Sequence, residues 1–219
     1  MSPRPGRATC KPFTDLLTGA IAAAAFLVCG AGLAEARELS IAIANMYFGS
    51  SLPPPTAEQM TVCYAFACSR RWQLDFTAAD RKTLANLLAT GRSSAAAERN
   101  AVQRAVVWFD RRVGPPVGTN RRVAKADIRT LDPAHNFDCF DTTRNTTSLL
   151  LALEQWNLLR HHVVGDPRYR GNILRGQLPH NTAVLIERGT GIGWVVDMWP
   201  RGYGELPDVM TVEQWLNEL

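Results

Sequence analysis

Two cysteines that lie five residues apart, Cys63 and Cys68, restrict the local fold more strongly than any other feature of the sequence. A disulfide requires two Cα atoms within ~7 Å of each other, whereas five residues of α-helix rise about 7.5 Å along the axis. If the two cysteines are bridged, the segment between them is poorly compatible with a helix. The spacing then predicts a hairpin with residues 64–67 in its loop, provided that the chain folds where disulfides form.

The amino-terminal 36 residues have the pattern of an export signal. Three basic residues precede an uncharged stretch, residues 16–34, which ends in the small-residue pattern Ala34-Glu35-Ala36. This order predicts a periplasmic or secreted protein that is cleaved near Ala36. An uncleaved anchor is the alternative, because the stretch approaches the ~20 residues that span a bilayer, but its glycines and alanines favour cleavage. Lipidation at Cys29 ranks below both.

Export makes the number of cysteines informative. Of five cysteines, two lie in the predicted signal, and Cys63 and Cys68 are close enough to pair. Cys139 is then the unpaired thiol, which needs an explanation in an oxidising compartment. A buried, inert cysteine is one explanation, and a catalytic nucleophile is the other.

Hydrophobic periodicity predicts one α+β domain over residues 37–219. Alternating apolar residues predict strands over 38–48, 72–76, 182–187 and 193–198. Capping residues and helical spacing predict helices over 77–89, 95–113, 139 to about 161, and 212–218, the second of them stopped by Gly114-Pro115-Pro116. Residues 117–137 show no sustained period, and a connection of that length tends to line a site.

Cys139 lies at the expected start of a helix, and His180 and Asp197 follow it in the sequence. The free N–H groups and the dipole of a helix N-terminus favour a thiolate, whereas the neighbouring Asp138 and Asp141 carboxylates raise a thiol pKa. A histidine that takes the thiol proton and a carboxylate that orients this histidine complete a nucleophilic triad. We therefore predict catalytic roles for Cys139, His180 and Asp197.

The register of the last two strands decides whether His180 and Asp197 meet. A turn centred on residues 188–189 places them directly opposite each other, and one centred on 189–190 makes them diagonal neighbours on one face. A shift by one residue moves Asp197 to the other face.

Other candidate sites carry weaker signals. His135 lies four residues before Cys139 and competes with His180 as the base, but it lies in a loop. The adjacent His161 and His162 point to different faces of a helix, and no ligand set has zinc spacing, so neither a metal nor another cofactor is predicted. The net charge is +4 with scattered arginines, which argues against nucleic-acid binding because there is no basic stripe interleaved with aromatic residues.

Three short motifs resemble the core of bacterial transglutaminase-like cysteine peptidases, within the papain-like group. They are Asp138-Cys139-x-Asp141, His180-x-x-Ala183-Val184-Leu185 and Trp194-Val195-Val196-Asp197. The helix that ends in Val107-Trp108-Phe109-Asp110-Arg111-Arg112-Val113 is also similar to the helix that precedes the cysteine of this family. The likeness covers roughly residues 95–200.

The resemblance implies an α+β papain-like or transglutaminase-like fold, in which the helix that carries the cysteine packs on a small antiparallel sheet. It also implies thioester chemistry on a peptide or protein substrate, with hydrolysis and transamidation both open. The family includes members thought to bind without cutting. The alternative is therefore a non-catalytic periplasmic module that binds peptide or cell-wall fragments.

Overall fold

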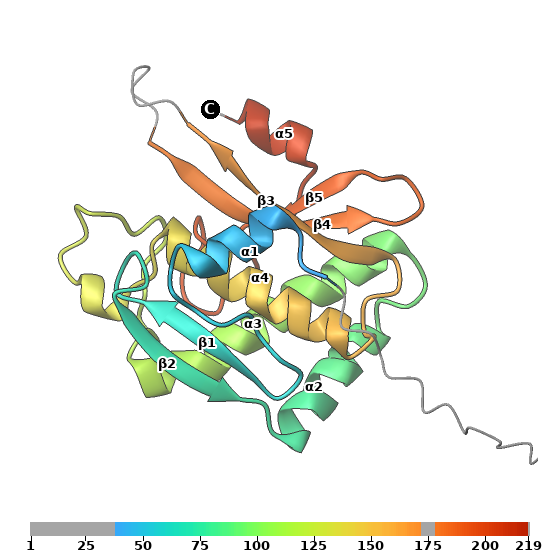
Figure 1. Cartoon of the computed structure of the whole chain (residues 1–219), viewed down its shortest axis with the longest axis horizontal. Helices are drawn as coiled ribbons and strands as arrows, with labels where there is room; N and C mark the ends of the chain where they lie inside the picture. Colours follow the sequence, from blue (N-terminus) through green and yellow to red (C-terminus); the bar gives the residue numbers. More distant parts are fainter. Residues whose placement is uncertain (1–37, 172–177, 219) are drawn as a thin grey trace, which may run out of the picture. The chain divides into compact units, whose positions relative to one another are not determined.

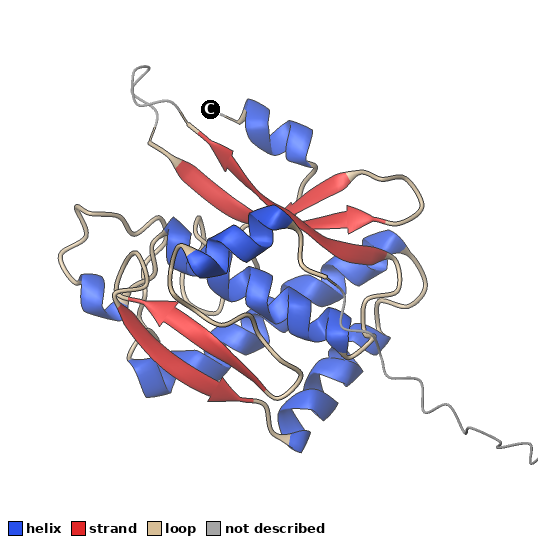
Figure 2. Cartoon of the chain, viewed as in Figure 1, coloured by secondary structure: helices blue, strands red, loops and turns tan. Residues whose placement is uncertain are grey.

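The computed structural model describes residues 38–171 and 178–218, which form an α+β protein with a two-stranded and a three-stranded antiparallel sheet (Figures 1 and 2). In chain order, the elements are α1 (Ile41–Phe48), β1 (Gln59–Tyr64), β2 (Arg70–Asp75), α2 (Ala78–Ala89), α3 (Ala95–Val117), the 3-10 helix η1 (Pro133–His135), α4 (Cys139–Gln155), β3 (His162–Arg170), β4 (His180–Glu187), β5 (Gly193–Val196) and α5 (Val212–Asn217). The predicted α+β class is confirmed.

Helix α4 is the central element, and it contacts β1, β3, β4 and α3 (Figure 1). Nearly all of its residues from Asp141 to Leu153 are buried, polar and apolar alike. Polar side chains on this helix therefore need partners in the neighbouring elements. Asn145 pairs with both backbone groups of Cys63 at 2.8 Å, and Ser148 meets the Tyr47 hydroxyl at 2.8 Å. These bonds attach the β1 hairpin and α1 to α4.

The hairpin predicted from the cysteine spacing is present. Strands β1 and β2 pair from Gln59↔Asp75 to Tyr64↔Arg70, and the Cys63–Cys68 disulfide closes the turn with Cα atoms 4.5 Å apart. The turn residues Ala65, Phe66, Ala67 and Cys68 all have positive φ, between 48° and 67°. Non-glycine residues reach this left-handed region at a cost of about 1–2 kcal/mol each, so the surrounding contacts must hold the turn in place.

Strands β3, β4 and β5 form the second sheet in that order, with both pairs antiparallel. Ala183 lies opposite Val196 and Val184 opposite Val195, which is the register of a turn centred on residues 189–190. Ala183 and Val196 face the main core, whereas Val184 and Val195 pack against Trp215. Helix α5 thus covers the face of the sheet that points away from α4 (Figure 1).

Helices α2 and α3 pack against each other and begin where the capping residues predict. Thr77 and Ser94 accept hydrogen bonds from the third helical N–H in α2 and α3, respectively. The expected stop of α3 at Gly114 is wrong, because the helix continues to Val117. Pro115 and Pro116 lack an N–H, but their φ suits a helix. The chain therefore keeps turning until Gly118, whose φ of 81° ends the helix.

The predicted strand over residues 38–48 is wrong, since most of this segment is helix α1. Ser40 caps the helix by accepting from the N–H of Ile43, and Ile43, Met46 and Tyr47 form its buried face at helical spacing. Ile41, which fits the alternating pattern of a strand, is 81% exposed. A short apolar run can satisfy both periods, and packing of Ile43, Met46 and Tyr47 in the main core decides between them.

The predicted end of the helix that starts at Cys139 is also wrong. Helix α4 stops at Gln155, Asn157 takes a φ of 55°, and His162 begins strand β3. The sequence pattern predicts no strand over residues 162–170, which contain Gly165 and Pro167. Pro167 is instead tolerated because the register of β3 and β4 shifts between Gly165 and Arg168, where a strand can accept a residue without an N–H.

The predicted export signal, residues 1–36, lies outside the described residues. Within the described part of the chain, every helix is too short or too polar to cross a membrane.

Candidate active site

Cys139 is the first residue of α4, and two carboxylates organise this helix start. Asp138 is the N-cap and accepts the N–H of Asp141 at 2.8 Å, while the Asp141 carboxylate reaches back to the N–H of Asp138. Such a capping box uses helix N–H groups that otherwise lack a partner. It fixes the backbone on both sides of Cys139.

The disulfide-closed turn docks on the same two carboxylates. Asp141 accepts the N–H groups of Phe66 at 2.9 Å and Cys68 at 2.7 Å, and Asp138 accepts the N–H of Ala67 at 2.7 Å. The left-handed turn points three successive N–H groups in one direction, as anion-binding backbone nests do. The turn therefore donates three hydrogen bonds to the Asp138 and Asp141 carboxyl groups beside Cys139, and these carboxyl groups hold the turn in its costly conformation.

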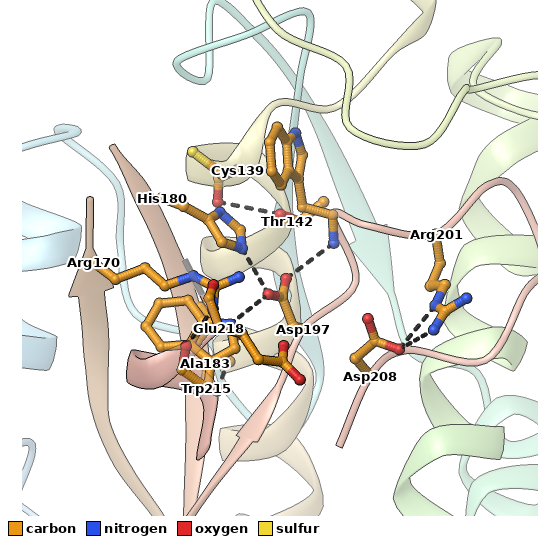
Figure 3. A network of polar contacts seen from close by, with 12 residues as sticks. Cys139, Thr142, Arg170, His180, Ala183, Asp197, Arg201, Asp208, Trp215 and Glu218 are labelled. Atoms are coloured by element: carbon orange, nitrogen blue, oxygen red, sulfur yellow. Dashed lines mark hydrogen bonds and ion pairs between the residues drawn. The ribbon is translucent and has the colours of Figure 1, made fainter. Parts of the chain in front are cut away.

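The Cys139 sulfur lies against the start of strand β4. Its thiol contacts the carbonyl oxygen of Pro179 at 4.0 Å, and the N–H of Asn181 interacts with the sulfur. These two residues flank His180 in the sequence. The start of α4, which carries Cys139, and the start of β4, which carries His180, therefore meet at this point (Figure 3). Cys139 is 8% exposed and is the free cysteine of the described residues.

Burial, with smaller contributions from the Asp138 and Asp197 carboxylates, raises the pKa of the Cys139 thiol to about 11. The N–H groups of Asn181 and of Cys139 itself oppose this rise. With His180 neutral, only about one thiol in ten thousand is ionised at pH 7. Deprotonation at neutral pH therefore needs a base inside the site.

His180 and Asp197 form a buried hydrogen-bonded pair. Nε2 of His180 lies 2.6 Å from Oδ2 of Asp197, and the side chains are 5% and 2% exposed. The strand register places them as diagonal neighbours, since Ala183 pairs with Val196 and both side chains lie on the α5 face. This arrangement is the second of the two that the sequence left open (Figure 3).

Asp197 accepts two further hydrogen bonds, so each of its carboxylate oxygens has at least one donor. Nε1 of Trp215 donates to Oδ2 at 2.9 Å, and the backbone N–H of Trp199 donates to Oδ1 at 3.3 Å. The backbone of Asp197 also pairs with that of Asp208 in both directions at 2.8 Å. Because an ionised carboxylate only accepts, His180 donates from Nε2.

The other imidazole nitrogen of His180 is left without a partner. Nδ1 is buried and makes no hydrogen bond to any residue that the structure describes. Since Nε2 carries the hydrogen, Nδ1 is the basic nitrogen. The imidazole is held between two indoles, with ring centroids 4.5 Å from Trp199 and 5.4 Å from Trp215. The histidine is thus fixed in orientation, with Nδ1 as the nitrogen that can accept a proton.

The long connection before α4 borders this site, as expected for residues 117–137. The N–H of Lys125 donates to the carbonyl oxygen of Trp199 at 2.8 Å, and Nε1 of Trp199 donates to the carbonyl oxygen of Ala126 at 2.7 Å. Trp199 therefore links the connection to the imidazole of His180.

The remaining histidines lie in other environments. His135 is held by Asp132, whose carboxylate lies 2.8 Å from Nδ1, and its ring covers Gly118. His162 is fully buried and pairs with Glu98 at 2.8 Å, which also accepts the N–H groups of Arg160 and His161. Glu98 lies in the first turn of α3, is 1% exposed and anchors the chain before β3.

Sequence reasoning missed two parts of this site. Trp215 lies in a short terminal helix with no pattern that connects it to Asp197. The backbone N–H groups of residues 66–68 cannot be recognised from the side chains at these positions, although the Cys63–Cys68 spacing did indicate a tight turn. Within residues 38–171 and 178–218, histidine, cysteine and carboxylate side chains form no group that could hold a metal ion.

Comparison of the chain with protein-family models, with curated proteins and with solved structures gave no match.

Proposed function

We propose that this protein is an exported, cysteine-dependent acyl-transfer enzyme with Cys139 as nucleophile, His180 as base and acid, and Asp197 as the residue that orients His180. The observation that carries the proposal is the state of His180. Asp197 accepts the hydrogen bond of its Nε2–H, which leaves a buried Nδ1 with no partner among the described residues. The two sequence neighbours of His180 contact the Cys139 sulfur.

The first half of the reaction transfers an acyl group to sulfur. As the Cys139 sulfur attacks a carbonyl carbon, the thiol proton passes to Nδ1 of His180, and an S–C bond forms. Asp197 stabilises the resulting imidazolium. The imidazolium then returns the proton to the leaving nitrogen or oxygen as its bond to carbon breaks, and a thioester remains on Cys139.

The second half releases the acyl group. Water or an amine attacks the thioester while Nδ1 of His180 accepts its proton, and the C–S bond breaks to restore the thiol. Water gives peptidase or amidase activity, and an amine gives crosslinking. Both outcomes use the same residues of this chain.

The start of α4 supplies donors for the oxyanion. In its first turn, the N–H of Asp141 bonds to the Asp138 side chain and that of Thr142 to the Asp138 carbonyl oxygen. The N–H groups of Cys139 and Phe140 are the two that this capping does not use. They lie at the nucleophile itself, where a developing negative charge needs donors.

The fold and the disulfide fit the same proposal. A helix that begins with the cysteine and packs on an antiparallel sheet is the arrangement expected of a papain-like or transglutaminase-like core. The Cys63–Cys68 disulfide persists in oxidising compartments, which agrees with export to the periplasm or the medium. Substrates there include peptides, proteins and cell-wall fragments.

A second candidate is a non-catalytic binding module on the same fold. The observation that favours it is the low exposure of Cys139, 8%, together with its raised pKa. An inert buried thiol has both properties. The two candidates differ in whether His180 activates Cys139.

The test is the rate of Cys139 alkylation by iodoacetamide, followed by mass spectrometry of the Cys139 peptide from the full chain. We define the alkylation ratio as the rate at pH 7 divided by the rate at pH 10. For a lone thiol with a pKa of about 11, the ratio is on the order of 10⁻³, because the thiolate fraction changes about tenfold per pH unit. A thiol that gives its proton to His180 reacts at pH 7 and has a much higher ratio.

The proposal predicts a high ratio for the wild type and a ratio on the order of 10⁻³ for His180→Ala. His135→Ala is the matched control, because His135 pairs with Asp132 at the protein surface, and it should keep the wild-type ratio. A wild-type ratio as low as that of His180→Ala would favour the binding module.

A further inference from the structure

Trp215 brings helix α5 into contact with the His180–Asp197 pair. Its Nε1–H donates to Oδ2 of Asp197 at 2.9 Å, the same oxygen that accepts from Nε2 of His180 at 2.6 Å. The indole lies 5.4 Å from the imidazole between ring centroids, and Trp215 is 1% exposed. One buried residue outside the proposed triad therefore contacts two of its members (Figure 3).

Arg170 fastens α5 in the position that this contact requires. Its guanidinium lies over the Trp215 indole, 4.3 Å from the ring centroid. It also donates to the carbonyl oxygens of Trp215 and Glu218 at the end of α5. Arg170 pairs with His180 in the ladder between β3 and β4. The strand pair that presents His180 thus also holds the helix that carries Trp215.

The shared oxygen explains why the indole N–H matters. Oδ2 of Asp197 lies between the donors of His180 and Trp215, and Oδ1 accepts from the N–H of Trp199. The carboxylate cannot rotate away from the imidazole without leaving a buried N–H unpaired, which is costly. If only the indole N–H is removed, the carboxylate loses this restraint while its charge remains.

We infer that Trp215 is a positioning residue: its Nε1–H holds the Asp197 carboxylate in the orientation that supports His180 as the base. The inference rests on the proposed function, since it has a consequence only if His180 takes the thiol proton. Through Trp215, helix α5 then helps to position the proposed catalytic residues.

Trp215→Phe tests the inference, because it keeps an aromatic ring in the core and removes the N–H. The matched control is Trp194→Phe. Trp194 lies on β5 and is partly buried, but its Nε1–H has no partner among the described residues. The alkylation ratio of the full chain is measured for both variants, for the wild type and for His180→Ala. Circular dichroism at pH 7 and pH 10 checks that each variant is folded, because unfolded chains expose Cys139 and are alkylated with a different ratio.

The expected result is a ratio on the order of tenfold below wild type for Trp215→Phe, as for a lost hydrogen bond to a charged group, and an unchanged ratio for Trp194→Phe. A wild-type ratio in Trp215→Phe overturns the inference and leaves the proposed function intact. Equal ratios in wild type and His180→Ala overturn both.

If circular dichroism shows that Trp215→Phe does not fold, Arg170→Lys carries the test. Lysine keeps the charge but lacks the planar guanidinium that stacks on the indole. The ratio should fall in the same direction as α5 loosens. An unchanged ratio in folded Arg170→Lys overturns the inference.

Discussion

Nε2 of His180 and Oδ2 of Asp197 are 2.6 Å apart, although the two residues come from diagonal positions on adjacent antiparallel strands. The diagonal separation at Cα is about 7 Å in such a ladder, so the side chains must reach toward each other to close it. The pair is buried between Trp199 and Trp215. This relationship leaves Nδ1 of the imidazole without a partner in the part of the chain that the structure describes, and the proposed chemistry depends on that nitrogen.

Replacement of Asp197 by asparagine should lower the alkylation ratio of Cys139 on the order of 100-fold, because the amide neither stabilises an imidazolium nor fixes the Nε2–H tautomer. The free energy of unfolding should also fall by about 1–3 kcal/mol, since an amide cannot accept from all the buried donors. Alkylation kinetics and urea denaturation measure the two effects.

Asp208→Asn is the control for this substitution. Asp208 shares the backbone bridge with Asp197, but its carboxylate pairs with Arg201. Its alkylation ratio should equal that of the wild type. Equal losses in both variants would mean that the carboxylate of Asp197 has no special role.

Loss of the disulfide should destabilise the protein and lower the reactivity of the Cys139 thiol at pH 7. For a loop of this length, chain entropy alone predicts a loss of about 2 kcal/mol in the free energy of unfolding of Cys63→Ala/Cys68→Ala. Released from its left-handed conformation, the turn would withdraw its N–H groups from Asp138 and Asp141, and the pKa of Cys139 would rise further. The free energy of unfolding, measured by urea denaturation, and the alkylation ratio of Cys139 should both be lower than in wild type. Unchanged values would show that the turn holds its shape without the bridge.

The stability of the protein should depend on pH through Asp141. Burial and the neighbouring Asp138 carboxylate raise the pKa of Asp141 to about 7, whereas the unfolded chain releases this proton near pH 4. The folded state therefore holds one more proton between these values. The associated stabilisation is complete below about pH 4 and is lost as the pH rises through about 7, with a slope of at most about 1.4 kcal/mol per pH unit.

Urea denaturation at pH 5 and pH 8 checks this dependence. Asp141→Asn should reduce the decrease in stability between the two pH values, and Asp75→Asn, which changes an exposed carboxylate at the end of β2, should leave it unchanged. The same decrease in wild type and Asp141→Asn would contradict the assignment.

The parts of the fold that the sequence predicted well are those with a local geometric rule. The Cys63–Cys68 spacing is poorly compatible with a helix and predicts the hairpin, and the helix that was expected to start near Cys139 does start there. The short Gly-containing turn between the last two strands allows only a few pairings of His180 and Asp197. The structure has one of them, the pairing of a turn centred on residues 189–190.

The parts that it missed depend on tertiary packing. The apolar run near Ile41 fits a strand or a helix, and packing against the core selects the helix, in which the Tyr47 hydroxyl meets Ser148 of α4. Strand β3 is interrupted by Pro167, which β4 accommodates at an irregular register. Trp215 meets Asp197 because α5 folds back over the sheet, a long-range contact that no spacing near residue 215 encodes.

The most direct test of the central claim is whether Cys139 forms a thioester that depends on His180. The full chain is incubated with a small activated acyl donor at pH 7, and the acylated Cys139 peptide is quantified by mass spectrometry before and after hydroxylamine, which cleaves thioesters. The account predicts a hydroxylamine-labile adduct on Cys139 in the wild type and in His135→Ala. It predicts a rate of formation lower by at least about 100-fold in His180→Ala, given the loss of general base catalysis. The account is contradicted if the adduct forms at the same rate without His180, or if the wild type forms none.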